Sequence, residues 1–290
     1  MPTPIIRKKV NLMLDVLKSI ILGIIEGITE WLPISSTGHL KLAGNLLAFE
    51  NVSEGFPQMF DYVVQLGAIL AVVVMFWNKL WPFTSKEKGF IKPKSMMIWL
   101  KVIVAMIPAA VAGILLDDWV ESLLVDPKLE ATVISATLII YGIAFLVIES
   151  INANKKPKVI SVKALTYKDA ILIGLFQVLS IIPGTSRSGS TILGAIILGV
   201  SRTVAAEFSF FLAVPVIFGA SLLKILKFGF NFTGIEFVIL AVGMVTAFVI
   251  SILAIKFLLG YIKKKDFKVF GYYRIVLGLL VLGYFWLLAK

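Results

Sequence analysis

Two carboxylates, a run of hydroxyls and the only histidine of the chain lie in one short stretch, EGITEWLPISSTGH (26–39). Glu26 and Glu30 are four residues apart, so on a helix they share one face about 6 Å from each other. Two carboxylates this close repel each other in a low-dielectric setting unless a proton, an arginine, a wet cavity or a cation offsets their charge. We expect Glu26 and Glu30 to hold a divalent cation, Mg²⁺ or Ca²⁺.

The hydroxyls that follow Pro33 supply a candidate nucleophile. A serine attacks only beside a base, and for Ser36 either His39 or Glu30 could serve. The same base could instead activate a water molecule, and attack by His39 itself also stays open. A lone histidine is more often structural, but the neighbouring hydroxyls and acids favour a chemical role for His39.

A second polar stretch, PGTSRSGST (183–191), has the composition of an anion-binding loop. Gly184 and Gly189 allow tight turns, and the amides at the start of a following helix would point at a bound anion. The guanidinium of Arg187 matches two phosphate oxygens. The residues expected to bind phosphate are Ser35, Thr37, Gly184, Thr185, Ser186, Arg187, Ser188 and Thr191, and the expected catalytic residues are Glu30, Ser36, His39 and Arg187. This set suits phosphoryl transfer.

The elements that must position these residues are membrane helices. The chain has 290 residues, 59% of them hydrophobic and 16% charged, and one bilayer crossing takes about 20 apolar residues. We therefore predict an all-α polytopic membrane protein that forms a single integral membrane domain over residues 1–290. The absence of cysteine excludes disulfides, thiolate metal sites and a cysteine nucleophile. Six segments are long enough to span, at about 58–77, 97–116, 131–150, 205–225, 236–259 and 271–289.

The charge of the connecting loops predicts the topology. Loops 78–96, 151–169 and 260–270 are rich in lysine, whereas loop 117–130 is rich in aspartate and glutamate. Because an excess of Lys and Arg marks the cytoplasmic side, the lysine-rich loops are expected inside. These loops and contact with anionic lipid account for the net charge of +11. We expect membrane lipids, and no nucleic acid, as partners.

Two apolar stretches are broken by polar turns. Stretch 170–200 is interrupted at Pro183, and the two spans that follow it already return the chain to the cytoplasmic side. It must therefore cross an even number of times or enter and leave by one face, as a re-entrant pair of half-helices. The stretch broken at Pro33 has the same construction. If it is also re-entrant the N-terminus lies outside, which the basic residues 7–9 oppose, so a single crossing stays an alternative.

The two broken stretches also align, 23–44 with 174–195. The matched pairs are Gly23 with Gly174, Glu26 with Gln177 and, after a one-residue slip, Pro33 with Pro183 and Ser36 with Ser186. Three spans follow each stretch, and an odd number of crossings gives the two halves, about 1–150 and 151–290, opposite orientations. We predict two inverted-topology repeats whose re-entrant helix pairs meet near the middle of the bilayer.

These motifs resemble those of the undecaprenyl-diphosphate phosphatase family of the bacitracin-resistance type. The resemblance rests on 26–39 and 183–191, and FDYVVQLGAILAVV (60–73) and RTVAAEFSFFLAVPVIFGAS (202–221) look like the flanking helices of that family. It covers nearly the whole chain, and neither core motif departs from the family pattern. The resemblance implies hydrolysis of undecaprenyl diphosphate, a polyprenyl diphosphate lipid, to undecaprenyl phosphate and inorganic phosphate. This regenerates the lipid carrier for peptidoglycan synthesis and removes the diphosphate that bacitracin binds.

The resemblance further implies residue roles and a location. Glu26 and Glu30 match the acidic motif linked to metal and catalysis, Ser36 and His39 match loop residues, and Arg187 matches the phosphate-binding arginine. The implied location is the bacterial plasma (inner) membrane, with the active site open to the outer face, and a homodimer is left open. The competing hypothesis is a secondary transporter or lipid-carrier translocase, because transporters also use inverted repeats with broken helices. A nucleophile and base beside the anion site favour the hydrolase. A purely structural subunit does not explain the clustered Glu, His and Arg.

Overall fold

Six long helices form the frame of the molecule. The computed structural model describes residues 4–84, 90–229 and 232–288, with the backbone alone for 4–11, 41, 45 and 288. Within this part, six helices are long and apolar enough to cross a membrane, and no strand is formed. They are α3 (Phe56–Met75), α5 (Pro93–Leu123), α6 (Pro127–Asn152), α9 (Arg202–Phe228), α10 (Gly234–Ile262) and α11 (Lys268–Gly283), which continues as a π-helical turn over Tyr284–Leu288. The prediction of an all-α polytopic membrane protein with six spans is confirmed.

Four of the six predicted spans cover only the apolar centres of their helices, whereas the span predicted at 58–77 runs two residues past the end of α3. Helix α5 extends to Leu123 and so contains the first half of the acidic segment that we expected to be a loop. No glycine or proline interrupts the chain there until Pro127, which occupies the first turn of α6, where a missing N–H breaks no helical bond. The Asp126 side chain then caps α6 by accepting from the backbone N–H of Lys128 at 2.9 Å. Most of segment 117–130 is therefore helical.

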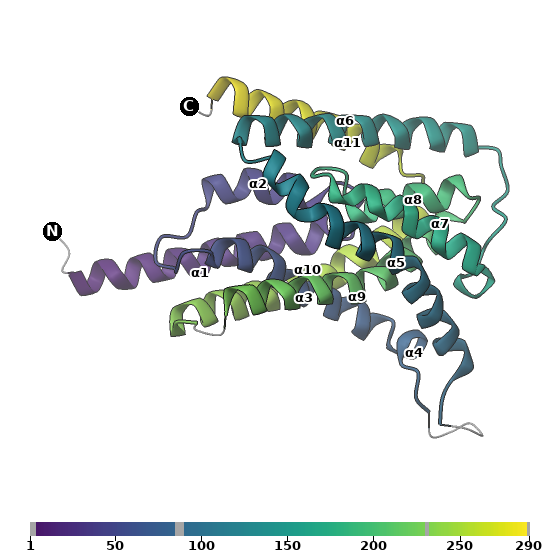
Figure 1. Cartoon of the computed structure of the whole chain (residues 1–290), viewed down its shortest axis with the longest axis horizontal. Helices are drawn as coiled ribbons and strands as arrows, with labels where there is room; N and C mark the ends of the chain where they lie inside the picture. Colours follow the sequence, from purple (N-terminus) through teal and green to yellow (C-terminus); the bar gives the residue numbers. More distant parts are fainter. Residues whose placement is uncertain (1–3, 85–89, 230–231, 289–290) are drawn as a thin grey trace.

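Two further pairs of helices are separated by the polar turns. Helices α1 (Pro4–Thr29) and α2 (Ser36–Leu46) lie against each other, as do α7 (Tyr167–Val178) and α8 (Arg187–Ile197), with a 3₁₀ turn (Leu179–Ile181) after α7 (Figure 1). Proline, glycine and serine residues at both turns prevent a continuous helix.

Helices α2 and α8 begin with the same cap. Ser35 and Ser186 are the two non-glycine residues with positive φ in the described chain, at 74° and 70°. Each hydroxyl accepts from the backbone N–H three residues on, Gly38 or Gly189. Both capping pairs match at a separation of 151 residues, the separation of Gly23 and Gly174. At this separation Ser35, rather than Ser36, lies opposite Ser186, and the one-residue slip in the predicted alignment is needed only to match Pro33 with Pro183.

Each broken pair packs on a long helix from the other half of the chain. Helix α1 lies along α10 and α7 along α5, while α3 packs on α9 and α6 on α11 (Figure 1). Gly23 faces the carbonyl of Gly243, and Gly174 faces the carbonyl of Ala105. A methyl group at either glycine would collide with that oxygen. Small residues at such contacts let helix backbones approach closely in a membrane.

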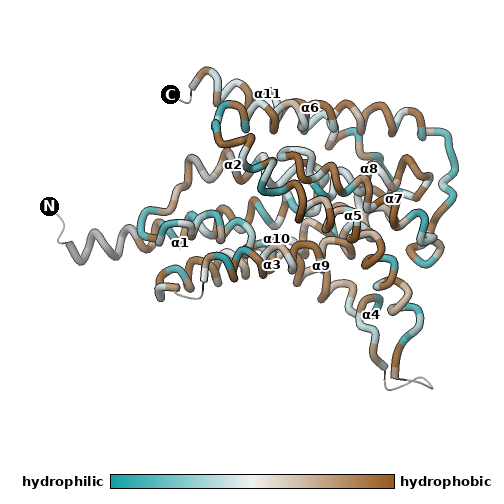
Figure 2. The backbone as a smooth tube through the Cα atoms, in the orientation of Figure 1, coloured by the Kyte–Doolittle hydropathy of each residue, from teal (hydrophilic) through white to brown (hydrophobic). Residues whose placement is uncertain are grey.

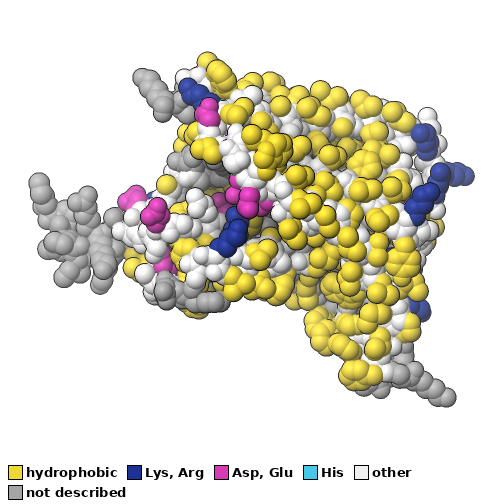
Figure 3. Space-filling view, in the orientation of Figure 1, with side chains coloured by type: hydrophobic (Ala, Val, Ile, Leu, Met, Phe, Trp, Pro, Cys, Tyr) yellow, Lys and Arg dark blue, Asp and Glu magenta, His cyan; other side chains and the backbone are white. Residues whose placement is uncertain are grey.

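Apolar side chains cover much of the outer surface. The long helices are predominantly hydrophobic along their length (Figure 2), and their side chains form a broad apolar band on the visible face (Figure 3). Ile114 and Leu253, for example, are 83% and 58% exposed. Soluble monomers rarely expose contiguous apolar surface of this extent. Lys and Arg gather at the end that carries the α6–α7 connection (Figures 1 and 3). This surface is that of a multi-pass membrane protein.

Candidate active site

The two polar turns meet at an ion pair. Glu30, just after α1, accepts hydrogen bonds at Oε1 from Nη2 and Nε of Arg187, at 3.0 and 3.3 Å. Both side chains are nearly buried, although the residues are 157 positions apart in the sequence. The remaining nitrogen of Arg187, Nη1, donates to the carbonyl of Ser209 in α9 at 2.8 Å. The structure thus brings together the predicted catalytic acid and the predicted phosphate-binding arginine.

Ser36 contacts the same carboxylate from the other side. Its Oγ donates to Oε2 of Glu30 at 3.0 Å. Glu30 therefore binds the hydroxyl with one oxygen and the guanidinium with the other. A carboxylate in this position can take the proton of the serine hydroxyl. Of the two bases that the sequence left open, Glu30 is the one in contact with Ser36.

His39 is directed toward α11 instead. Its Nδ1 lies 2.7 Å from the carbonyl oxygen of Ser35, and its Nε2 lies 2.7 Å from the hydroxyl of Tyr273. The two rings stack with their centroids 5.6 Å apart. Because a carbonyl only accepts, this pattern puts the proton of a neutral imidazole on Nδ1, and Nε2 accepts from Tyr273. Neither ring nitrogen is directed at Ser36, and the contact that we considered between Ser36 and His39 is not formed.

Glu26 lies one helical turn before Glu30 and is completely buried. Neither of its carboxylate oxygens has a hydrogen-bond partner among the described residues. Because burying an unpaired carboxylate is costly, this position calls for a proton or a cation. Magnesium is often held by one or two carboxylates together with waters and substrate phosphates. The pair of Glu26 and Glu30 fits that pattern. The described residues contain no group of three or more His, Cys, Asp and Glu that could hold a metal ion, so waters or substrate phosphates would have to complete the ligand set.

The hydroxyls of the second turn make bonds that close the turn. Thr185 donates to the carbonyls of Leu179 and Ile182, Ser188 to that of Leu32, and Thr191 to that of Arg187. The Oγ1 of Thr191 also lies 2.7 Å from Oγ of Ser209. Among the other residues expected to bind phosphate, Ser35 and Ser186 cap helices, Thr37 is exposed, and Gly184 has a φ of 87°. The described contacts leave Arg187 as the residue of this turn that reaches Glu30.

Sequence reasoning missed Arg274, which fastens the two turns together. This residue of α11 is completely buried. Its Nη1 donates to the carbonyl of Pro33 at 3.1 Å, and its Nη2 donates to those of Gly184 and Thr185 at 2.8 and 3.0 Å. One guanidinium thus holds carbonyls from both turns. The signal was available in the sequence, because an arginine inside a predicted span is rare and usually functional.

Comparison with known proteins agrees with this site. Residues 19–280 match the family model described as Bacitracin resistance protein BacA. An undecaprenyl-diphosphatase of Lachnoclostridium phytofermentans is 60% identical over 277 residues, which cover 96% of this chain and 99% of that protein. One from Enterococcus faecalis is 56% identical over 93% of this chain and 96% of its own length. An undecaprenyl-diphosphatase 1 of Clostridioides difficile is 55% identical over 95% and 98% of the two chains. The resemblance seen in the two motifs is confirmed, and the chain belongs to the BacA bacitracin-resistance family.

Proposed function

We propose that this protein hydrolyses undecaprenyl diphosphate to undecaprenyl phosphate and inorganic phosphate. The relatives that match almost the whole chain are named undecaprenyl-diphosphatases. The observation that carries the proposal is the Glu30 carboxylate, which contacts both the Ser36 hydroxyl and the Arg187 guanidinium. Phosphoryl transfer depends on positioning these parts and on neutralising charge. Transport of the lipid would not require a base beside a hydroxyl.

In this mechanism Arg187 binds oxygens of the terminal phosphate. Glu30 takes the proton of Ser36 while Oγ attacks the terminal phosphorus. The bond from that phosphorus to the bridging oxygen breaks, and undecaprenyl phosphate leaves with the bonding electrons. A water molecule then attacks the phosphorus of the phosphoserine. The bond from that phosphorus to Oγ breaks, and Oγ keeps the bonding electrons and takes back the proton that Glu30 holds, which releases inorganic phosphate and restores Ser36. Direct attack by a water that Glu30 activates gives the same products in one step.

Glu26 and Glu30 are the residues that would hold a divalent cation, Mg²⁺ or Ca²⁺. Such a cation would supply neutralisation of phosphate charge. The proposal is supported by the two unpartnered oxygens of Glu26 and by the position of Glu30 one turn later. His39 and Tyr273 would hold the turn that carries Ser36, through the bond from His39 to the Ser35 carbonyl.

We place this site within an inverted repeat that opens to the outer face of the bacterial inner membrane. The proposal is supported by the shared serine cap of α2 and α8 and by the reciprocal packing of α1 on α10 and α7 on α5. In this arrangement α1–α2 and α7–α8 are the two re-entrant pairs, in halves 1–150 and 151–290. The lysine-rich loops then lie in the cytoplasm. A homodimer stays a prediction, which the mass of the purified protein in nanodiscs would test.

Phosphate release from a polyprenyl diphosphate tests the proposed activity. Purified protein is assayed with Mg²⁺, with Ca²⁺ and with a chelator. Arg187→Ala is expected to lower turnover by at least about 100-fold, as loss of a charge-stabilising donor does, and Ser36→Ala by at least about 1,000-fold. Ser122→Ala, at an exposed serine of α5, is the matched control. Substantial turnover by Ser36→Ala would assign the attack to water, and absence of release under every condition would favour the translocase.

A further inference from the structure

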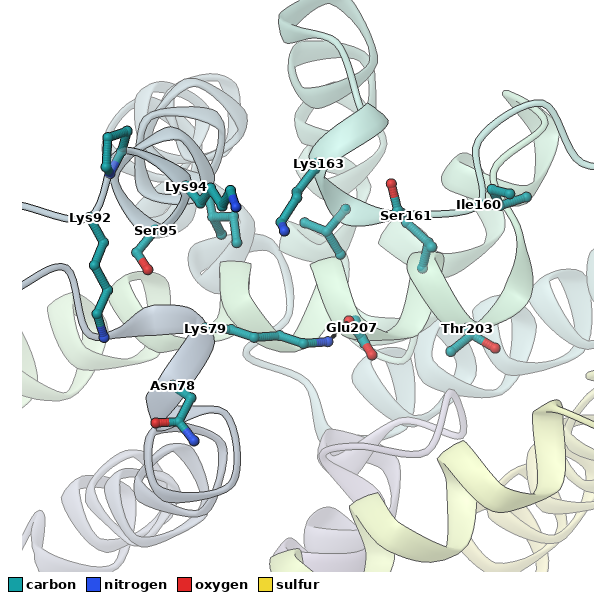
Figure 4. A pocket seen from close by; sticks show the side chains of 14 residues that line it. Asn78, Lys79, Lys92, Lys94, Ser95, Ile160, Ser161, Lys163, Thr203 and Glu207 are labelled. Atoms are coloured by element: carbon teal, nitrogen blue, oxygen red, sulfur yellow. Dashed lines mark hydrogen bonds and ion pairs between the residues drawn. The ribbon is translucent and has the colours of Figure 1, made fainter. Parts of the chain in front are cut away.

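A polar cavity lies at the lysine-rich end of the molecule. It has a volume of about 800 Å³ and shares no lining residue with the contacts around Glu30. Its walls are α4 (Trp77–Leu80), the first turns of α5 and α9, and the segment 160–163 before α7 (Figure 4). The proposed hydrolysis gives this cavity no role.

Among the described residues, positive charge exceeds negative charge in the walls of this cavity. Four lysines and one carboxylate line it: Lys79, Lys92, Lys94, Lys163 and Glu207. Nζ of Lys79 lies 2.8 Å from Oε2 of Glu207, so this carboxylate is already neutralised (Figure 4). The other three lysines form no ion pair with the described residues. Like charges gathered in a concave site attract an anion.

Unpartnered hydrogen-bond donors face the same cavity. Ser95 is only 3% exposed and lines the cavity, yet its hydroxyl makes no hydrogen bond to the described residues. Helices α5 and α9 both begin at this wall without a side-chain cap from the described residues, whereas Asp126, Thr166 and Thr233 cap α6, α7 and α10. The free first-turn amides of two long helices add partial positive charge and donors for an anion.

Neighbouring aromatic residues place the cavity at the depth of lipid headgroups. Trp77 and Trp81 stack with ring centroids 4.3 Å apart and are 44% and 40% exposed. The indole N–H of Trp99 donates to the carbonyl of Leu80 at 2.7 Å. Tryptophan is enriched at the boundary between water and acyl chains. Apolar side chains share the walls with the lysines: Ile98, Ile160, Val162 and Val204.

We propose that this cavity binds the phosphate group of an anionic membrane phospholipid from the leaflet at the lysine-rich end. Lys92, Lys94 and Lys163 neutralise the phosphate, and the Ser95 hydroxyl donates to it. The buried Lys101 donates to the Lys163 carbonyl at 2.8 Å, which fixes this part of the wall to α5. A bound headgroup would join the start of α5, the start of α9 and segment 160–163. Basic pockets between membrane helices are a known type of site for lipid phosphates.

Lipid titration of the purified full-length protein tests this proposal. Phosphatidylglycerol, phosphatidylcholine and inorganic phosphate are each added in neutral detergent, and binding is measured by native mass spectrometry and by the melting temperature. Phosphatidylglycerol is expected to bind and to raise the melting temperature, whereas the other two leave both unchanged. The triple variant Lys92→Gln, Lys94→Gln, Lys163→Gln should bind phosphatidylglycerol at least about tenfold more weakly.

A second triple variant removes the same charge elsewhere at this end. Lys168, Lys264 and Lys265 are exposed and do not line this cavity. Their change to Gln should therefore alter the affinity for phosphatidylglycerol by less than about twofold. Equal affinity of the two triple variants would overturn the proposal. Protection by inorganic phosphate equal to that by phosphatidylglycerol would assign a soluble anion instead and overturn the lipid assignment.

A neutral variant keeps the proposal testable if the triple variant misfolds. Ser95→Ala removes the hydroxyl without changing charge, and it should weaken phosphatidylglycerol binding about fivefold or more, as loss of a hydrogen bond to a charged group does. Unchanged affinity in this variant would remove Ser95 from the site.

Discussion

Glu30 divides its two oxygens between the nucleophile and the phosphate-binding arginine. While Arg187 lies on Oε1, the guanidinium neutralises the charge of the carboxylate that also accepts from Ser36. A phosphate that draws Arg187 away would remove this counter-charge, while Oε2 stays on Ser36. Substrate binding would then leave Glu30 in contact with Ser36 alone when the hydroxyl proton is taken. This exchange of partners requires no large movement of either turn.

Glu26 is the residue whose charge state should reveal the proposed cation. Glu26→Gln keeps the size of the side chain and removes the unpartnered carboxylate. We expect at least about tenfold more Mg²⁺ or Ca²⁺ to be needed for half-maximal activity. The variant should also lose the rise in melting temperature that the cation gives the unchanged protein, because it lacks a ligand.

Glu54→Gln is the control for this change, since Glu54 is exposed and lies outside the site. It should respond to cations as the unchanged protein does. If Glu26→Gln also keeps the full response in both activity and melting temperature, Glu26 is not a ligand.

At the scale of the elements, the two serine caps start the helices that carry Ser36 and Arg187. Both caps have a positive φ that only glycine adopts without strain. Ser186→Ala loses the capping bond and keeps the strain, so we expect it to lower the free energy of unfolding by about 1–3 kcal/mol. Ser186→Gly loses the capping bond but relieves the strain, so it should lower the free energy of unfolding by less than Ser186→Ala does. Thermal unfolding in detergent measures the stability of the two variants. An alanine variant as stable as the glycine variant would contradict this prediction.

Arg274 connects three elements, α11 and both turns. Arg274→Met leaves three buried carbonyls without their donor, and we expect it to cost about 3–5 kcal/mol of stability and to abolish activity. Arg274→Lys should rescue little, because one ammonium lacks the fork that reaches both turns. Melting temperature and phosphate release check both variants. The control is Lys256→Met, at an exposed lysine of α10, which should change stability and activity little. A stable and active Arg274→Met would show that the two turns do not need the hydrogen bonds from Arg274.

The sequence predicted the spans and the breaks because both signals are local. An apolar run, or a proline among serines, is visible within about 20 residues. The partner of Ser36 could not be predicted in this way. His39 faces away from it because Tyr273, 234 positions later, takes its Nε2. The helical acidic segment 117–123 was missed because charge was taken as the sign of a loop, although nothing in those residues breaks a helix.

At the scale of the whole molecule, the orientation in the membrane can be tested with the cysteine-free chain. Single cysteines are introduced at two exposed positions, Glu54→Cys between α2 and α3 and Lys264→Cys between α10 and α11. Because the lysine-rich loops are expected in the cytoplasm, a membrane-impermeant maleimide should label Glu54→Cys in intact spheroplasts. Lys264→Cys should react only after the membrane is opened. The unchanged chain, which has no cysteine, gives the background, and the reverse pattern would invert the topology.

The position of Arg274 in the last helix has a consequence for biogenesis. The ribosome makes both polar turns well before it makes the guanidinium that joins them. A nascent chain that stops before α11 therefore carries Glu30, Ser36 and Arg187 without the fastener that aligns them. We therefore expect the protein to become active only when the final helix is inserted. Fragments released early from translation should not hydrolyse the lipid diphosphate.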